Sequence, residues 1–278
     1  MKQITENDIA AFEQKLRLND RAEATVIKYT TALRRLMEWL AEREISKELL
    51  MEYREYLRET CTARTVNGVL TAINLWLDME DMAEYRVKML KIQRRLFRPD
   101  ERELTRHEFD RLVQTAKRLG KQRLMLVMET ICATGIRVSE LKYITVAAAK
   151  AGKTEISLKG KIRTILIPAK LCRKLKEYAS KQKIASGEIF ITRNGTSLSR
   201  KQIWAEMKAL CEAARVEPTK VYPHNLRHLF ARCFYNATCD VVKLADVLGH
   251  SSVETTRIYL ISTGAEHVKT LESLQLVS

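Results

Sequence analysis

Apolar residues recur at helical spacing along the first third of the chain. The spacing is clearest in two runs, Leu33, Leu36, Met37 and Leu40, and then Val66, Val69, Leu70, Ile73 and Leu77. Residues three and four apart share one face of a helix, so each run marks an apolar stripe that packs against a neighbour. Thr62 or Thr65 is placed to cap the second run. The pattern predicts a bundle of amphipathic helices over residues 5–95.

A boundary is predicted where this pattern stops. Residues 86–98 contain six basic side chains and no acid, and Pro99 with the polar run DERELTRHE follows. Proline disfavours helix in the residue before it, which places the boundary near residues 98–104. The basic segment is either a solvated helix face or a strap lying on phosphates. We therefore expect a helical domain over residues 1–98, a linker over 99–103 and a second domain over 104–278.

The second domain is predicted to be helical with one exception. Thr105 and Glu108 fit a capping box that begins a new helix. Residues 154–168, TEISLKGKIRTILIP, instead hold two runs of β-branched residues around Lys159-Gly160-Lys161, which predicts a β-hairpin. Because only 13 residues are Gly or Pro and 46% are hydrophobic, we expect a mainly α fold with a small antiparallel β-sheet.

The charge is strongly positive and unevenly distributed. The formal net charge is +15. Residues 1–100 hold 18 Lys and Arg against 17 Asp and Glu, a net of +1, so residues 101–278 carry +14. This excess is expected of a protein that binds a polyanion, and it places the electrostatic field on the second domain.

The cysteines and the N-terminal residues favour a cytoplasmic protein. The six cysteines form no CxxC pair, so neither a disulfide framework nor a zinc ribbon is expected. The first residues, MKQITENDIAAFEQKL, contain acids where a signal peptide needs an apolar run, and no stretch approaches eighteen apolar residues. We expect reduced thiols and no contact with a membrane.

Candidate chemistry begins in HNLRHLFARCF, residues 224–234. At about 100° per residue, one flank of this helix carries His224, Arg227 and the small Ala231. The apolar stripe beside it is formed by Leu226, Leu229, Phe230, Cys233 and Phe234. Alone, the flank is an ordinary exposed polar edge. His224 and His228 stand four apart as in a zinc-protease helix, but position 225 is Asn rather than Glu, so no metal is expected.

Two further motifs contribute candidate residues. In residues 240–260, DVVKLADVLGHSSVETTRIYL, Gly249 ends one helix and Ser251 with Glu254 begins another. This puts His250 in a tight turn and Tyr259 about two turns into the second helix, where a tyrosine usually serves packing. In TGIRVSEL, residues 134–141, Gly135 allows a sharp backbone approach beside Arg137, and Glu140 follows on the same face. Alone, that motif is a structural Arg–Glu pair.

In combination and in this order, the motifs resemble the tyrosine recombinase (phage integrase) family. The resemblance runs through residues 104–262 and is closest to its compact, two-domain Xer type. It implies that Arg137 and Arg227 clamp a phosphate, that Tyr259 is the nucleophile, and that residues 1–98 form a SAM-like core-binding domain. It also implies catalytic roles for Lys159, His224 and His250, and a supporting role for Glu140. Relatives commonly carry a longer glycine-flanked hairpin, so Lys161 is the alternative to Lys159.

The chemistry that the resemblance implies needs no metal and no cofactor. Two planar guanidinium groups neutralise the negative charge that grows on a phosphate under attack. His224 accepts the proton of the tyrosine, and the hairpin lysine protonates the 5′-oxygen leaving group. The product is a 3′-phosphotyrosyl intermediate that another DNA end can resolve. The implied partners are double-stranded DNA, three further copies of the chain in a tetramer on two DNA sites, and an accessory or excision factor.

Other functions remain to be weighed against this one. A type IB topoisomerase uses similar tyrosine chemistry but rejoins the same strand, and a non-catalytic relative would only bind DNA. A metal-dependent nuclease is disfavoured because no cluster of acids suggests metal ligands. The tail from Gly264 has an apolar helical stripe that either docks on a neighbouring protomer or packs on its own domain. A mobile element is the expected setting, but the sequence reveals neither the DNA target nor whether the task is integration, excision, chromosome-dimer resolution or inversion.

Overall fold

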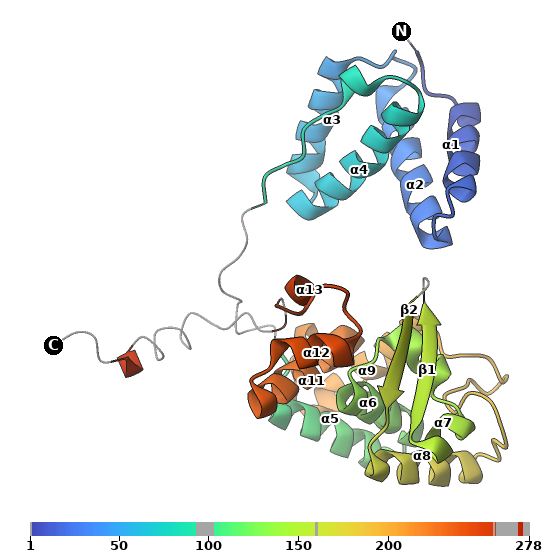
Figure 1. Cartoon of the computed structure of the whole chain (residues 1–278), viewed down its shortest axis with the longest axis vertical. Helices are drawn as coiled ribbons and strands as arrows, with labels where there is room; N and C mark the ends of the chain where they lie inside the picture. The colour runs from blue at the N-terminus through green and yellow to red at the C-terminus, as the bar shows by residue number, and fades with distance from the viewer. Residues whose placement is uncertain (1, 93–102, 159–160, 258, 260–271, 275–278) are drawn as a thin grey trace. The chain divides into compact units, whose positions relative to one another are not determined.

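The computed structural model describes residues 2–92, 103–158, 161–257, 259 and 272–274 (Figure 1). The chain divides into two compact units, Met1–Arg94 (unit 1) and Arg95–Ser278 (unit 2). The described residues are mainly helical and form one two-stranded antiparallel sheet, which confirms the predicted fold class. The predicted linker, residues 99–103, lies largely outside the described residues, so the boundary assigned to it stays a prediction.

Unit 1 is the predicted helical bundle. Its α-helices are α1 (Glu6–Leu18), α2 (Glu23–Leu40), α3 (Lys47–Thr60) and α4 (Ala63–Met79), followed by the short 3₁₀ helix η1 (Ala83–Tyr85). Thr62 caps α4 by accepting a hydrogen bond from the backbone N–H of Thr65, which decides between the two predicted caps. Phe12, Leu36 and Trp76 are fully buried between the helices. The apolar stripes read from the sequence therefore form one core.

Two asparagines of α4 bind the extended chain that follows η1. The amide of Asn74 donates to the backbone oxygen of Val87 at 2.9 Å and accepts from its N–H at 3.1 Å. Asn67, two helical turns earlier, makes the same pair of hydrogen bonds to Leu90, at 2.9 and 2.8 Å. The first part of the basic segment is thus attached to α4 through its backbone, which leaves its side chains for other contacts.

Unit 2 is built around α6, which is buried on most of its faces. Its elements before the sheet are α5 (Arg106–Arg118), α6 (Gln122–Thr134), η3 (Val138–Tyr143) and α7 (Val146–Ala151). After the sheet come α8 (Ala169–Lys181), α9 (Arg200–Lys208), α10 (Cys211–Ala214), η4 (Pro218–Lys220), α11 (Pro223–Thr238), α12 (Val241–Leu248) and α13 (Val253–Arg257). Helices α5, α8, α9 and α11 all pack against α6. The capping box predicted at Thr105 and Glu108 is present.

The predicted hairpin is formed by β1 (Lys153–Leu158) and β2 (Lys161–Leu166). In its antiparallel register Ile156 pairs with Arg163 and Thr154 with Ile165. Ile156 and Ile165 are buried, whereas Ile162 is 76% exposed and Leu166 is 69% exposed. Because side chains alternate across a strand, Arg163 belongs to the inward face with Ile165. Lys159 and Gly160, at the turn, lie outside the described residues.

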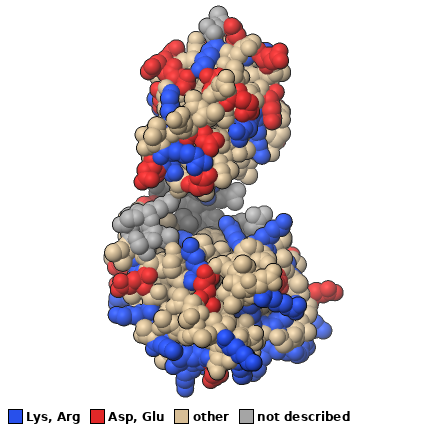
Figure 2. All heavy atoms as spheres, turned by 90° about the vertical axis from the view of Figure 1, so that its right-hand side faces the viewer, with Lys and Arg blue, Asp and Glu red and all other residues tan. Residues whose placement is uncertain are grey.

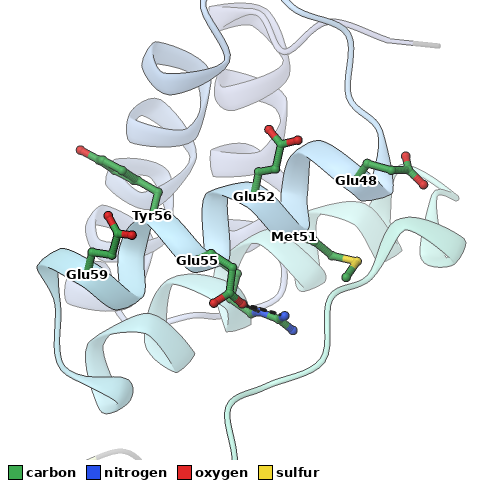
Figure 3. Close-up of a pocket in the computed structure, with 7 residues that line it drawn as sticks. Glu48, Met51, Glu52, Glu55, Tyr56 and Glu59 are labelled. Atoms are coloured by element: carbon green, nitrogen blue, oxygen red, sulfur yellow. Dashed lines mark hydrogen bonds and ion pairs between the residues drawn. The ribbon is translucent and has the colours of Figure 1, made fainter.

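The surfaces of the two units differ in charge. Figure 2 shows mainly Lys and Arg over unit 2, whereas unit 1 carries both signs. A shallow hollow on α3 is lined by Glu48, Met51, Glu52, Arg54, Glu55, Tyr56 and Glu59 (Figure 3). Four carboxylates on one face repel phosphates, so this face of α3 is unsuited to a polyanion. No described helix is long and apolar enough to cross a membrane.

Replacing Asn74 by Ala is expected to destabilise unit 1. The substitution leaves the N–H and C=O of Val87, which is 4% exposed, without their partners. We expect the free energy of unfolding to fall by about 2 kcal/mol, measured by urea unfolding of the full chain followed by tryptophan fluorescence. Asn67→Ala is the matched control and should cost about half as much, because Leu90 is only partly buried. If both variants lost the same free energy of unfolding, the greater importance of the buried Asn74 contact would be contradicted.

Candidate active site

The guanidinium of Arg227 lies at the centre of the candidate site. Arg227 is 1% exposed, in the second turn of α11, which begins with Pro223 at its first position. Nη1 donates to the backbone oxygen of Gly135, and Nη2 donates to that of Leu248 at 2.8 Å. Nε lies 3.4 Å from the hydroxyl oxygen of Tyr259. One side chain therefore joins the ends of α6 and α12 to the tyrosine.

The end of α6 approaches α11 closely enough to require glycine. Gly135 has a φ of +65°, and a Cβ at this position would lie 2.4 Å from the ring of Phe230. A side chain would meet both backbone strain and a steric clash. The close approach predicted from TGIRVSEL is therefore present. It places the oxygen of Gly135 within reach of Arg227 and leads the chain into η3.

A buried carboxylate holds Arg137. Glu140 is 0% exposed and accepts two hydrogen bonds from Arg137, from the backbone N–H at 2.7 Å and from Nη1 at 2.9 Å. The predicted Arg–Glu pair is confirmed. The side chain of Arg137 remains 42% exposed, so the rest of its guanidinium faces solvent. Nη1 of Arg163, which the sequence analysis did not single out, also lies 3.2 Å from this carboxylate.

The turn between α12 and α13 positions His250. Gly249 ends α12 in the left-handed conformation, as predicted. The Nε2 atom of His250 lies 2.9 Å from Nη2 of Arg227, and Nδ1 lies 2.9 Å from Oγ1 of Thr256. Since a guanidinium can only donate, Nε2 is the acceptor and Nδ1 carries the proton. Burial, and then the charge of Arg227, lower the pKa of His250 to about 4, so this imidazole is neutral at pH 7.

Tyr259 lies beyond the described part of α13. That helix covers Val253–Arg257, so the position predicted for Tyr259, two turns inside a helix, is wrong. The predicted cap is also displaced, because Oγ of Ser252, not that of Ser251, accepts from the N–H of Glu254, at 3.2 Å. The N–H of Tyr259 donates to the oxygen of Thr256 at 2.9 Å, which forms a turn after the helix. The side chain of Tyr259 is 3% exposed, and its hydroxyl lies beside Arg227.

Three imidazole rings surround the ring of Tyr259. The ring centroid of His250 lies 5.6 Å away in a nearly parallel stack, that of His228 lies 4.4 Å away, and that of His224 lies 5.9 Å away. His228 is buried, whereas His224 is exposed at the start of α11. From its spacing, His228 was considered only as a metal ligand, and its contact with Tyr259 was not predicted. The one indication in the sequence was that His228 directly follows Arg227 in the chain.

The predicted apolar stripe of α11 is only partly correct. Leu226 and Leu229 are buried, but Cys233 is exposed. The first two turns of α11 are instead buried on nearly every side, since Arg227 and His228 are buried as well. Apolar periodicity does not reveal polar side chains that are buried through hydrogen bonds to other segments. No group of three or more metal-ligating side chains occurs among the residues that the structure describes.

The fold brings together five of the six predicted site residues. Arg227, His250 and Tyr259 are in contact, and His224 lies beside the ring of the tyrosine. Arg137 is close enough for its charge to lower the pKa of Arg227, although burial is the main cause of that shift. Lys159 lies outside the described residues, and only the backbone of its alternative, Lys161, is described, in β2. The choice between the lysines stays open.

Comparison with known proteins places this arrangement in a family. The model of the Phage integrase family matches residues 102–266, more than half of the chain. The chain belongs to the phage integrase family. Tyrosine recombinase XerA of Pyrococcus furiosus is 28% identical over 277 residues, covering 96% of this chain and 93% of the relative. XerA of Thermococcus kodakarensis is 29% identical, covering 94% and 92%. The predicted class, a tyrosine-type site-specific recombinase, is confirmed.

Solved structures support the same fold. A lambda integrase dimer bound to a COC′ core site matches with a TM-score of 0.72 and 18% identity, covering 92% of this chain and 94% of that chain. The XerH recombinase in a pre-cleavage complex with its difH substrate matches with a TM-score of 0.70 and 19% identity, covering 97% and 85%. The phage integrase fold of this chain therefore extends through both units.

His250 is expected to make the stability of this recombinase depend on pH. Its pKa is about 4 in the folded chain and 6.5 ordinarily, so in this range the unfolded chain binds the additional proton. The stabilising contribution is complete above pH 6.5 and is lost as the pH falls toward 4. In His250→Gln, the urea midpoint should therefore change less between pH 6.5 and 4.5 than in the wild type. His107→Gln, at an exposed position on α5, should keep the wild-type dependence. If the urea midpoints of all three proteins changed with pH in the same way, the assignment of this dependence to His250 would be refuted.

Proposed function

We propose that the protein cleaves and rejoins DNA at specific sites through a covalent bond between Tyr259 and a 3′-phosphate. The observation that carries the proposal is the hydroxyl of Tyr259, held 3.4 Å from Nε of the buried Arg227. A phenol used only for packing does not require a buried guanidinium beside its oxygen. The placement suits a nucleophile that attacks a phosphate bound to the same arginine.

Arg137 and Arg227 supply the positive charge that the reaction requires. A phosphodiester resists attack because it is an anion, and negative charge on its non-bridging oxygens grows in the transition state. Arg137 is 42% exposed and can approach a phosphate from solvent. Arg227 is held by two backbone carbonyl groups, so its orientation is fixed before DNA arrives. Such preorganised donors stabilise the transition state without a metal ion.

Two histidines serve different parts of the reaction. His224, exposed beside the ring of Tyr259, accepts the phenol proton directly or through water. His250 is neutral in the free protein and accepts a hydrogen bond from Arg227. A bound phosphate brings negative charge that favours the protonated imidazole, so His250 becomes a third donor to the phosphate.

The bonds and protons balance without a cofactor. The oxygen of Tyr259 bonds to phosphorus, the bond to the 5′-oxygen breaks, and that oxygen receives a proton from Lys159, with Lys161 as the alternative. The phosphotyrosyl ester conserves the energy of the broken bond. A 5′-hydroxyl of another strand then reverses the steps and releases the tyrosine. Neither a metal ion nor a nucleotide is part of this cycle.

We further propose that the recombinase acts as a homotetramer on two double-stranded DNA sites. A lambda integrase tetramer bound to a Holliday junction matches this chain with a TM-score of 0.72 and covers 91% of it. The basic excess of residues 101–278 supports binding to DNA. We propose that the chain acts on DNA in the cytoplasm. An accessory or excision factor is a further expected partner. Residues 260–271, in which most of the tail lies, are outside the described residues.

Tyr259→Phe should abolish covalent joining to DNA and leave DNA affinity unchanged. Adducts captured from fragmented genomic DNA of the source organism give the cleaved sequence, from which nicked suicide duplexes are made. Wild type should then form an adduct that resists denaturing gels, even in chelator, and the variant should form none. Absence of an adduct with wild type would refute the proposal. Relaxation of plasmids that lack the site would instead indicate a topoisomerase.

The leaving-group lysine can be identified with a 5′-bridging phosphorothiolate. Sulfur departs without protonation, so this substrate restores the cleavage rate of a variant that lacks the general acid. We expect Lys159→Ala to cleave the ordinary duplex at least about 100-fold more slowly than wild type and the phosphorothiolate at nearly the wild-type rate. Lys161→Ala should cleave the ordinary duplex at a rate much closer to that of wild type. Rescue of Lys161→Ala alone would transfer the role to Lys161.

A further inference from the structure

Arg163 lies beside the site, largely shielded from solvent, and is not one of the predicted site residues. It projects from the inward face of β2, and its side chain is 10% exposed. Nη1 contacts the carboxylate of Glu140 at 3.2 Å, so Glu140 lies between two arginines, Arg137 and Arg163. Burial lowers the pKa of Arg163 to about 10, which still leaves the guanidinium charged at neutral pH. A third positive charge is thus built into the site.

The turn that carries His250 is shaped around the same side chain. A Cβ on Gly249 would lie 2.3 Å from Cδ of Arg163. The aliphatic part of Arg163 therefore crosses Gly249 directly, which explains why this helix end is a glycine for steric as well as conformational reasons. The charge of Arg163 also helps to lower the pKa of His250, after burial and the charges of Arg227 and Arg137.

A purely structural role does not explain this arginine. Its Nε and Nη2 atoms are buried and have no hydrogen-bond partner among the described residues. A leucine or methionine would fill the same inward position of a hairpin without leaving donors unsatisfied. Local arrangements that are unfavourable for stability are concentrated at functional sites. The charge, rather than the packing, is therefore the property that requires explanation.

The charges around Glu140 explain what the third arginine does. Arg137 and Glu140 alone form a neutral pair, which would direct the guanidinium of Arg137 toward the carboxylate and away from a phosphate. With Arg163 on the same carboxylate, the group Arg137, Glu140 and Arg163 carries a net charge of +1. Glu140 then fixes the position of Arg137 without cancelling its charge. Adding Arg227 gives +2, which matches the doubly negative transition state of phosphoryl transfer.

We propose that Arg163 is a positioning residue that neutralises Glu140, so that the charge of Arg137 remains available to the scissile phosphate. It acts through Glu140 and does not touch DNA, because its side chain is only 10% exposed and Nε and Nη2 are buried. The inference rests on the proposed function, since it assigns Arg137 to the phosphate.

The test measures adduct formation on suicide duplexes with an ordinary phosphate and with a methylphosphonate at the cleavage position. The methylphosphonate lacks the negative charge, so cleavage of it depends less on arginine charge. Arg163→Gln should slow cleavage of the ordinary duplex by roughly 100-fold, with Kd for DNA within about threefold of wild type. On the methylphosphonate, its cleavage rate should be less than about tenfold below that of wild type. The same is expected of Arg137→Gln, which serves as the benchmark. A misfolded fraction would slow both substrates equally.

Charge restoration provides the second readout. Arg163→Lys keeps a positive charge, so its cleavage rate on the ordinary duplex should fall by less than about tenfold. Glu140→Gln combined with Arg163→Gln restores the local charge to +1, so this double variant should be faster than Arg163→Gln alone. A structural role predicts the opposite, because the double variant removes two buried partners. Leu166→Gln, on the outward face of β2, is the matched control and should match wild type.

The outcomes separate the two proposals. Suppose that wild type forms an adduct but the cleavage rate of Arg163→Gln falls by the same factor on both substrates, or that the double variant cleaves more slowly than the single variant. Either result overturns the role of Arg163 and leaves the proposed function standing. If Arg163→Gln cleaves as fast as wild type, the inference fails in the same way. If wild type forms no adduct at its own site, the proposed function fails, and the role of Arg163 fails with it.

Discussion

The buried guanidinium of Arg227 connects the segments that make up the candidate active site. It reaches the end of α6 through the oxygen of Gly135, the end of α12 through the oxygen of Leu248, and the tyrosine through its hydroxyl. A buried charge is unfavourable unless hydrogen bonds compensate for the lost water. The segments must therefore stay in place to satisfy the arginine, and the arginine in turn fixes them. The geometry of the site and the stability of this part of unit 2 depend on each other.

Glycine makes these close approaches possible at two helix ends. Gly135 admits the ring of Phe230 beside α6, and Gly249 admits Arg163 beside α12. Both have positive φ and both end a helix, so the last carbonyl groups of the helix are turned toward a neighbouring cation. Helix C-termini carry partial negative charge, which favours the arginines that gather there. Among the residues that the structure describes, the positive charge at the centre of the site thus comes from arginines.

Histidine protonation is controlled by the same group of cations. His250 lies among three arginines and is kept neutral, which lets it accept a hydrogen bond from Arg227 in the free protein. Its other nitrogen is fixed by Thr256 on α13, the helix that precedes Tyr259. The turn, the imidazole and the tyrosine are thus linked to one another through Arg227 and Thr256. Unit 1 contributes a separately packed bundle, with an acidic face on α3 that is unsuited to DNA (Figure 3).

Local patterns in the sequence determined the helices, the hairpin, the cap at Thr105, the glycine at 249 and the pairing of Arg137 with Glu140, whereas the choice of Thr62 over Thr65 as the cap of α4 came from the structure. Each depends on residues close together in the chain, so spacing alone reveals it. The resemblance to a family supplied the roles of the site residues. Tertiary structure alone decided that Tyr259 lies past α13, that His228 packs on its ring and that Arg163 reaches Glu140. The first of these opposes a local helix signal, and the other two join residues 31 and 23 positions apart. Burial of polar groups through distant hydrogen bonds leaves no periodic trace.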